Sequence, residues 1–519
     1  MWGRHRIVRS GQVCIIVGVM CMTPNRRIEQ TLTRYLDKLQ MEIQHGKSWV
    51  RPEAGLSLVM SDDELLRRAV EQAEGSGEFF GLVEATASRY HPDRAARGSL
   101  DRLMKQVGEF FRLSGVYSRL FGGQEVQPAG VFERFRSAFE ATTQTKTHIA
   151  PIEWVYFGKE RIKFGDFEIR HLSDSELNSL LDSAVRRVFY PWAYVDPSKL
   201  SGYWFLIAKE TGAVDPPGRT LLHVPAPRVS PSYSRYPRAI EEALRVLALS
   251  DWIETSPLRK GTEKLGFSPW DGPMPVCIPF VISVSDHLLD WPRRAPDTSG
   301  LERLQVADPK TGEVLESPNF QVHWDPTRAD EFESLLASLC ITLERIRPHL
   351  GQWAFVATAL NFLLKGFTSD GLEHLLWDVT CLDALLGDDG RGATRRLSER
   401  VRNVLGEMVK ESFERIYQIR CDLVHGHAEY KGEVFLGHLS DARQMARLTA
   451  LWMLHFLECL ASAAEGSQSP LPGRKHLLKI LDGNAGVRQM HDALCKSLPA
   501  SFPQIDAWLG TPRPPGTRK

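Results

Sequence analysis

The sequence predicts a multidomain protein in which a helical N-terminal region precedes an α+β middle region and an all-α helical bundle. Three observations lead to this fold class. The chain has 519 residues, which is more than one ordinary hydrophobic core accommodates. Apolar and polar residues alternate between Ile162 and Ile169, as in strands. After Pro326, apolar residues recur at the three- and four-residue spacing of amphipathic helices.

Changes in sequence pattern divide the chain into five segments. We expect a leader with a short helix (1–59), a helical region (60–149), an α+β domain of unknown role (150–328), a helical bundle (329–465) and a C-terminal extension with a disordered end (466–519). The helical region opens at Ser61, because a serine followed by acidic residues is typical of a helix N-terminus. The extension contains one amphipathic stretch, from His476 to Leu481.

The composition is that of a soluble globular protein without a dominant charge. Apolar residues make up 43% and charged residues 25%, and 64 basic side chains balance 64 acidic ones. A nucleic-acid contact would therefore depend on a local basic patch. The eight cysteines form no C-x-x-C pair, which argues against a zinc ribbon or disulfide framework and for reduced thiols in the cytoplasm.

The N-terminus has some features of a signal peptide. Arg4, Arg6 and Arg9 precede an apolar run from Val13 to Met22. That run is too short to span a bilayer, and no small-residue cleavage site follows it. We therefore expect a cytoplasmic protein without a membrane segment, with translation starting at Met20 or Met22. Export is the alternative.

The middle region contains the patterns of a hairpin and two buried strands. Gly165-Asp166 supplies a two-residue turn between the alternating segments Ile162–Phe164 and Phe167–Ile169. The apolar runs Tyr203–Ala208 and Val276–Val284 indicate buried strands, and the proline-rich stretch 215–237 between them indicates an irregular loop. No catalytic motif is evident here.

One helix of the middle region has a clear start. Ser173 and Glu176 have the spacing of a capping box, and Leu172 can pack on Leu177 as a hydrophobic staple. Leu177, Leu180, Leu181 and Val185 would form its apolar stripe.

The C-terminal pattern is wholly helical. We expect five helices, over 332–346, 353–364, 372–386, 413–424 and 440–464. Pro348 ends the first of them, and Ser440 would be the N-cap of the last. Because the connections are short, these helices form a bundle.

The fourth of these helices carries the candidate chemistry. Its apolar row is Phe413, Ile416, Tyr417 and Val424, and Arg420 lies in line with that row. An unpaired charge inside a bundle would cost several kcal/mol, so Arg420 requires either a carboxylate partner or a cleft.

His425 ends the same helix, directly before Gly426, a residue type that caps helix C-termini. The helix dipole there favours the imidazolium form, so we expect the pKa of His425 to be raised into the range useful for acid–base catalysis. Five positions of an ideal helix correspond to about 140° and about 7.5 Å. Arg420 and His425 can therefore meet at one phosphate only through a distorted last turn or a second copy of the helix, and the second option predicts a homodimer.

These residues resemble the signature of a known family. Arg-x4-His followed by Gly at the end of an amphipathic helix is similar to the motif of HEPN domains, and Arg420–Gly426 is close to the version in the Apea-like branch. Thr380–Gly387 resembles the second-helix motif of that branch, and Ala359–Phe362 resembles the helix before it. The resemblance covers the helical bundle alone. It departs from the family where Asp383 replaces a commoner Glu and where Cys421 follows the arginine.

The resemblance implies a HEPN-type, metal-independent endoribonuclease without a cofactor, acting as a toxin or defence effector. His425 would help to deprotonate the RNA 2′-hydroxyl or to protonate the leaving 5′-oxygen, and Arg420 would stabilise charge on the phosphate. Asp422 and Asp383 would be supporting residues. The nearby arginines Arg391, Arg395, Arg396, Arg400 and Arg402 are candidates for binding RNA phosphates, with the first four the main ones.

Each of these functional interpretations has a structural alternative. Arg420 would pair with Asp383 or Asp378 inside the bundle while His425 only closes the helix. The arginine-rich segment would be a solvated face, ion-paired to Glu399 and Glu407. The domain as a whole would then be a non-catalytic HEPN module that binds nucleotide, RNA or protein, or that dimerises.

A further interpretation involves Cys421 and His425, which lie four positions apart and share a helix face. They could form a thiol nucleophile with its base or a metal pair. A packed cysteine is the simpler expectation, since no third ligand is nearby in the sequence.

Overall fold

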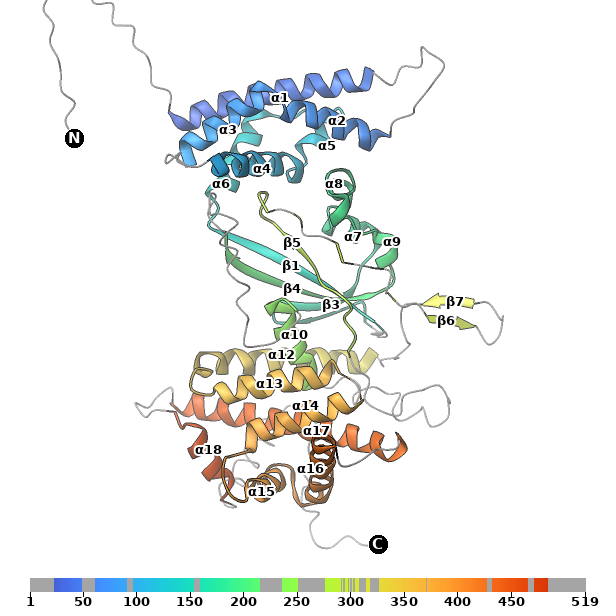
Figure 1. Cartoon of the computed structure of the whole chain (residues 1–519), viewed down its shortest axis with the longest axis vertical. Coiled ribbons are helices and arrows are strands. Elements are labelled where there is room, and N and C mark those ends of the chain that lie inside the picture. Colours follow the sequence, from blue (N-terminus) through green and yellow to red (C-terminus); the bar gives the residue numbers. More distant parts are fainter. Residues whose placement is uncertain are drawn as a thin grey trace, which may run out of the picture. The chain divides into compact units, whose positions relative to one another are not determined.

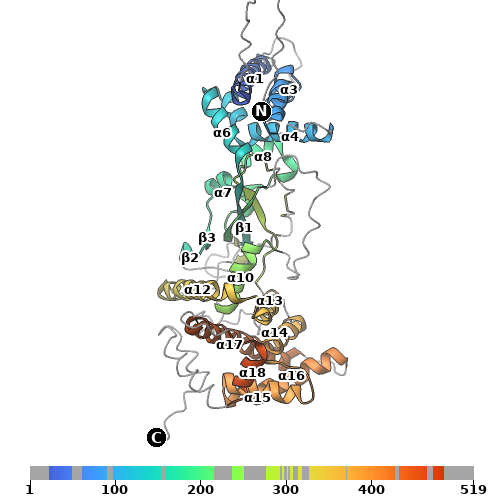
Figure 2. The same cartoon turned by 90° about the vertical axis from the view of Figure 1, so that its left-hand side faces the viewer.

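A computed structural model describes most of the chain (Figures 1 and 2). The described residues are 23–48, 61–90, 97–153, 159–214, 236–250, 276–290, 304–307, 314–317, 326–369, 371–426, 432–464 and 471–483, with isolated residues between 292 and 301. They fall into two compact units. The N-terminal unit comprises the described residues up to Thr142, together with Val214 and residues 287–290, and the C-terminal unit comprises the others.

The N-terminal unit is helical, as the sequence predicts. Its helices are α1 (Pro24–Ser48), α2 (Asp62–Glu74), α3 (Gly77–Tyr90), α4 (Arg97–Leu113), α5 (Val116–Phe121) and α6 (Pro128–Glu140). Ser61 caps α2 by accepting a hydrogen bond from the Glu64 amide, which confirms the predicted start. In the core, the Tyr35 and Tyr117 hydroxyls lie 2.8 Å apart, and Tyr117 donates to Glu74. Burial raises the pKa of the Glu74 carboxyl.

The C-terminal unit begins with an antiparallel sheet. Its strands are β1 (Thr143–Ile152), β2 (Arg161–Phe164), β3 (Phe167–His171), β4 (Trp204–Ala213) and β5 (Ile282–Ser285), in the order β2-β3-β4-β1-β5. A separate two-stranded ribbon pairs β6 (Leu304–Ala307) with β7 (Val314–Ser317).

The predicted hairpin is confirmed. Phe164 and Phe167 pair at its end, and Gly165 has a φ of 55°, a left-handed conformation that glycine adopts without strain. The predicted buried run Tyr203–Ala208 includes the whole buried first half of β4, Trp204–Ala208. Of the run Val276–Val284, only the last part is a strand. Of the proline-rich stretch 215–237, residues 215–235 lie outside the described residues.

The capping box at Ser173 and Glu176 is also confirmed. The helix that it starts is shorter than predicted, because α7 (Asp174–Leu180) ends before Val185 and α8 (Ser183–Phe189) follows it. Between them Asp182 adopts a φ of 47°, a left-handed conformation that a continuing α-helix cannot contain. A short 3-10 turn (Pro191–Ala193) and α9 (Pro197–Leu200) lead into β4.

The helical bundle follows the sheet in the same unit. Its helices are α12 (Pro326–Ile346), α13 (Ala354–Phe367), α14 (Gly371–Leu386), α15 (Ala393–Leu405), α16 (Lys410–His425), α17 (Gly432–Ala464) and α18 (Arg474–Leu481), with 3-10 turns at Arg347–His349 and Glu407–Val409. All five predicted helices are present, and so is the predicted stretch in α18. The N-cap prediction for Ser440 is wrong, because α17 starts at Gly432 and Ser440 lies inside it. Helix α15 was not among the predicted helices.

Helix α10 (Arg238–Ser250) lies between the sheet and the bundle in both views (Figures 1 and 2). One continuous group of buried residues includes Ile162 and Phe164 of the sheet, Leu244 of α10 and Phe332 of α12. Polar contacts add to this packing, since Arg245 donates to the Asn361 side chain over 2.8 Å. The predicted boundary between residues 328 and 329 therefore falls inside one compact unit.

None of the helices in the described ranges is long and apolar enough to cross a membrane. Cys277, Cys340, Cys381, Cys421 and Cys459 are free thiols. The predicted leader signal in residues 1–22 and the predicted disordered end in 484–519 lie outside the described residues.

Candidate functional site

The C-terminal end of α16 carries Arg420, Asp422 and His425 (α16 in Figure 1). The helix is regular through His425 and ends at Gly426, whose φ of 68° is the left-handed cap expected from the sequence. The His425 side chain is exposed. Because the last turn is undistorted, Arg420 and His425 point about 140° apart on the helix within one chain.

The core-facing row of α16 differs from the prediction at its end. Phe413 and Ile416 are fully buried, as expected, and Ile419 is buried as well. Val424 was expected in the core but is 54% exposed. The last turn of α16 therefore extends past the hydrophobic core, which leaves Arg420 half-buried rather than enclosed.

Arg420 packs on an aromatic ring and has no acidic partner among the residues that the structure describes. Its guanidinium carbon lies 5.9 Å from the centroid of the Tyr417 ring, within the range of a cation–π contact. Among the described residues, no carboxylate lies within ion-pair distance of this guanidinium. Arg420 thus keeps hydrogen-bond donors that an anionic ligand can accept.

The two carboxylates considered as internal partners of Arg420 lie elsewhere. Asp378 is fully buried beside His374, with 2.7 Å between Oδ2 and Nε2. Gly366 makes room for it, because a Cβ there would lie 2.5 Å from Asp378 Oδ1. Asp383 is exposed on α14. The alternative in which Arg420 is sealed by either acid is not observed.

The other residues near the motif have local roles. The Gln418 side chain donates to Asp422 Oδ1 over 2.7 Å, one turn apart on α16. Cys421 is half-buried beside it. Nowhere in the described part of the chain do three His, Cys, Asp or Glu side chains gather closely enough to hold a metal ion. Asp383 is not brought to Arg420 or His425 by any contact within that part.

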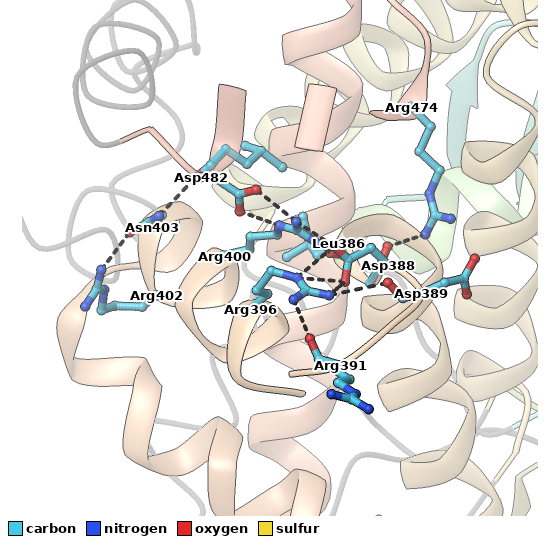
Figure 3. Close-up of polar contacts among 12 residues, drawn as sticks. Leu386, Asp388, Asp389, Arg391, Arg396, Arg400, Arg402, Asn403, Arg474 and Asp482 are labelled. Atoms are coloured by element: carbon cyan, nitrogen blue, oxygen red, sulfur yellow. Dashed lines mark hydrogen bonds and ion pairs between the residues drawn. The ribbon is translucent and has the colours of Figure 1, made fainter. Parts of the chain in front are cut away.

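The predicted RNA-binding arginines fall into two groups. Figure 3 shows Arg400 donating through all three of its nitrogen atoms. Its Nε and Nη2 atoms donate to the two Asp482 oxygens over 2.7 and 3.0 Å, Nη2 also donates to Asp388, and Nη1 donates to the Leu386 carbonyl. The Arg400 side chain is 2% exposed. In this structure Arg400 is therefore enclosed and does not face solvent, unlike a guanidinium that is open to RNA.

Arg396 also binds Asp388, through Nε at 2.9 Å and Nη2 at 2.8 Å, and it donates to the Arg391 carbonyl. The guanidinium of Arg396, and after it that of Arg400, holds the pKa of the Asp388 carboxyl below its usual range. Arg391 and Arg395 differ from them, because both are exposed and neither has an ion pair among the described residues. Arg402 makes the ion pairs that the alternative interpretation expected, to Glu399 within α15 and to Glu407 in the 3-10 turn that follows it.

Arg474 was missed by the sequence analysis. It starts α18 and donates to the backbone carbonyls of Asp383, Ala384 and Gly387, at the C-terminal end of α14. Figure 3 shows its guanidinium beside the segment that carries Leu386 and Asp388. Helix C-termini leave carbonyls without intrahelical partners, and a cation there also opposes the negative end of the dipole. We call Arg396, Arg400, Arg474, Asp388 and Asp482 together the arginine clamp. The feature of the sequence that could have identified Arg474 is its position as a basic residue just before the amphipathic stretch His476–Leu481.

A second missed group lies on the sheet. His148 Nδ1 is 2.8 Å from the Ser283 hydroxyl, and His148 Nε2 is 3.3 Å from a Glu210 oxygen. The Asp286 N–H donates to the Thr145 carbonyl, so these two residues form a hydrogen-bonded pair of the antiparallel ladder. Because such pairs alternate along the strands, His148 and Ser283 form a non-hydrogen-bonded pair, the type whose side chains lie closest. The His148 side chain is only 4% exposed. The group therefore joins three strands, and its burial argues against substrate access to the ring.

Comparison with known proteins adds no family assignment. No family model, curated protein or solved structure matches the chain.

Proposed function

We propose that this protein is a metal-independent endoribonuclease whose bundle is a HEPN-type domain, with Arg420 and His425 as catalytic residues. One observation carries the proposal: a guanidinium without an acidic partner in the described structure and an exposed imidazole lie five positions apart at the end of one helix. A structural arginine in this bundle is expected to be paired, as Arg400 is. The motif resemblance in the sequence adds the reaction class.

In the proposed reaction, the His425 imidazole removes the proton from an RNA 2′-hydroxyl. The 2′-oxygen then bonds to the adjacent phosphorus while the bond from phosphorus to the 5′-oxygen breaks. The 5′-oxygen takes up a proton from the imidazolium of a second His425. Arg420 donates hydrogen bonds to the phosphate oxygens, on which negative charge accumulates. The products are a 2′,3′-cyclic phosphate and a 5′-hydroxyl.

The reaction as proposed needs two copies of the chain. Within one regular helix, Arg420 and His425 are separated by about 140° of rotation, so one phosphate does not reach both easily. A two-fold axis beside the end of α16 would bring Arg420 of one protomer toward His425 of the other. The exposed Val424 supplies an apolar contact for such an interface. We therefore propose a homodimer with composite sites.

The test is cleavage of labelled RNA in EDTA by the wild type, His425→Ala and Arg420→Ala. Loss of a positioned acid–base group should lower the rate by about 10² to 10⁴, and loss of a charge-stabilising donor by about 10² to 10³. His476→Ala and Arg415→Ala are matched controls, because both residues are exposed on helices of the same bundle. Equal activity of His425→Ala and the wild type would refute the assignment.

The second candidate function is a non-catalytic module that binds RNA, nucleotide or protein. The engagement of Arg396 and Arg400 by Asp388 and Asp482 favours it, because two predicted phosphate contacts are then occupied by carboxylates in this structure. This candidate predicts that the wild type and both variants are equally silent in the cleavage assay. Dimerisation, measured by analytical ultracentrifugation, is expected under either function.

A further inference from the structure

Asp482 holds Arg400 in a geometry that also suits a phosphate group. Two parallel bonds join the Nε and Nη2 edge of the guanidinium to the two carboxylate oxygens, over 2.7 and 3.0 Å (Figure 3). Arginine binds carboxylates and phosphates through this same two-pronged edge. Building on the proposed function, we propose that the arginine clamp is a second RNA-phosphate site, and that Asp482 gates it by occupying Arg400 until a phosphodiester displaces it.

The two members of the pair differ in their access to solvent. The Arg400 side chain is 2% exposed and the Asp482 side chain is 43% exposed. Arg400 is also fixed by the Leu386 carbonyl and by Asp388. A competing anion therefore meets Asp482 first and finds Arg400 already positioned, so binding requires no rearrangement of the guanidinium.

The position of Asp482 in the chain makes its displacement local. It directly follows the last residue of α18, Leu481. The helix itself is held by the buried side chains of Leu477 and Leu478 and by Arg474. A rotation of the Asp482 side chain into solvent thus frees the Nε and Nη2 edge of Arg400 while α18 remains docked.

The charge balance of the clamp changes when Asp482 leaves. Arg396 and Arg400 then share one carboxylate, that of Asp388. Arg391 and Arg395 are exposed and have no ion pair among the described residues. Arg391 lies just before α15, and Arg395 lies in the first turn of that helix. The result is a local basic patch, which a chain with equal numbers of acidic and basic residues requires for RNA binding.

The experiment measures binding of a short fluorescent single-stranded RNA to the full chain in a His425→Ala background, where cleavage is suppressed. Asp482→Asn keeps the size of the side chain but removes the competing charge, so RNA affinity should rise about three- to tenfold. Asp389→Asn is the matched control, because Asp389 is an exposed neighbour that contributes only its carbonyl to the clamp. Inorganic pyrophosphate should compete with the RNA more strongly in Asp482→Asn than in the Asp389 control.

The double variant Asp482→Asn with Arg396→Gln should lose the gain in affinity. Equal effects of Asp482→Asn and Asp389→Asn would overturn the gate, because they would indicate a general charge effect. A decrease in affinity with Asp482→Asn would overturn it as well. The nuclease proposal is tested separately, because the binding assay does not depend on cleavage. If the wild type cleaves no RNA but the affinity changes are as expected, the nuclease proposal fails and the proposed gating by Asp482 stands.

Discussion

Arg400 and Arg420 lie on neighbouring helices of one bundle and differ in almost every contact. Arg400 is enclosed and donates to two carboxylates and a carbonyl. Arg420 is half-buried, packs on Tyr417 and has no acidic partner in the described structure. The comparison teaches that this domain can neutralise a buried guanidinium fully, so an arginine left without a carboxylate is a candidate for function rather than for stability.

The strongest test of this difference is Arg400→Ala, which should have the largest effect on stability. The change removes the bonds to Asp388, Asp482 and the Leu386 carbonyl. We expect a loss of about 2 to 3 kcal/mol, less than for a fully buried pair because both carboxylates reach solvent. Urea denaturation measures it, with Arg395→Ala as the control. A loss below that of the control would mean that the clamp is not structural.

Gly426→Ala should have a smaller effect, centred on the end of α16. A side chain at a φ of 68° strains the backbone, at a cost of about 1 kcal/mol. Gly426→Asn is the control, since Asn tolerates this conformation better. Thermal unfolding should rank the glycine form above Asn and Asn above Ala. Because the strain frays the turn that carries His425, RNA cleavage should fall in the same order.

The lowered pKa of Asp388 should make the stability contribution of the arginine clamp depend on pH in the acid range. Its pKa is lowered in the folded state by Arg396 and Arg400, whereas the unfolded chain has an aspartate pKa of about 3.9. The stabilising contribution is therefore complete above about pH 4 and is lost as the pH falls through the lowered value. Urea midpoints measured below pH 5 should decline less steeply for Asp388→Asn than for the wild type. Parallel declines would contradict the assignment.

Arg420→Ala should have the smallest effect on stability, within about 0.5 kcal/mol of the wild type. Among the described residues no carboxylate pairs with the Arg420 guanidinium, so its removal leaves no acid unpaired there. The same urea assay used for Arg400→Ala measures it. A loss matching that of Arg400→Ala would erase the distinction between the two arginines and weaken the catalytic proposal.

Local signals in the sequence predicted several elements well. The Gly165 turn and the Ser173 capping box depend on few neighbouring residues, and both are present in the structure. The periodicity of the bundle likewise located α12, α13, α14, α16 and α17. The glycine cap at Gly426 followed from residue type alone. In each case the information is contained within a few turns of chain.

Elements shaped by tertiary contacts were missed. Strand β1 pairs with both β4 and β5, yet its first half carries Thr, Gln and Lys, so no apolar alternation marks it. Helix α15 is rich in arginine, and one of these residues, Arg400, is buried because it pairs with Asp482, which lies 82 positions later in the chain. The exposure of Val424 depends on where the core ends. Sequence analysis therefore singled out Arg420 and His425 as candidates but could not predict that Arg400 is enclosed by carboxylates while Arg420 is not.

The shared core of sheet, α10 and bundle has a consequence for how this unit folds. Removing the sheet would expose the apolar side of α12 that Ile162 and Phe164 cover. The two parts are therefore expected to unfold cooperatively, in one transition, and the bundle expressed alone should aggregate. A signal that strains the strands would reach the helices through the same side chains, which gives the sheet a mechanical route to any activity of the bundle.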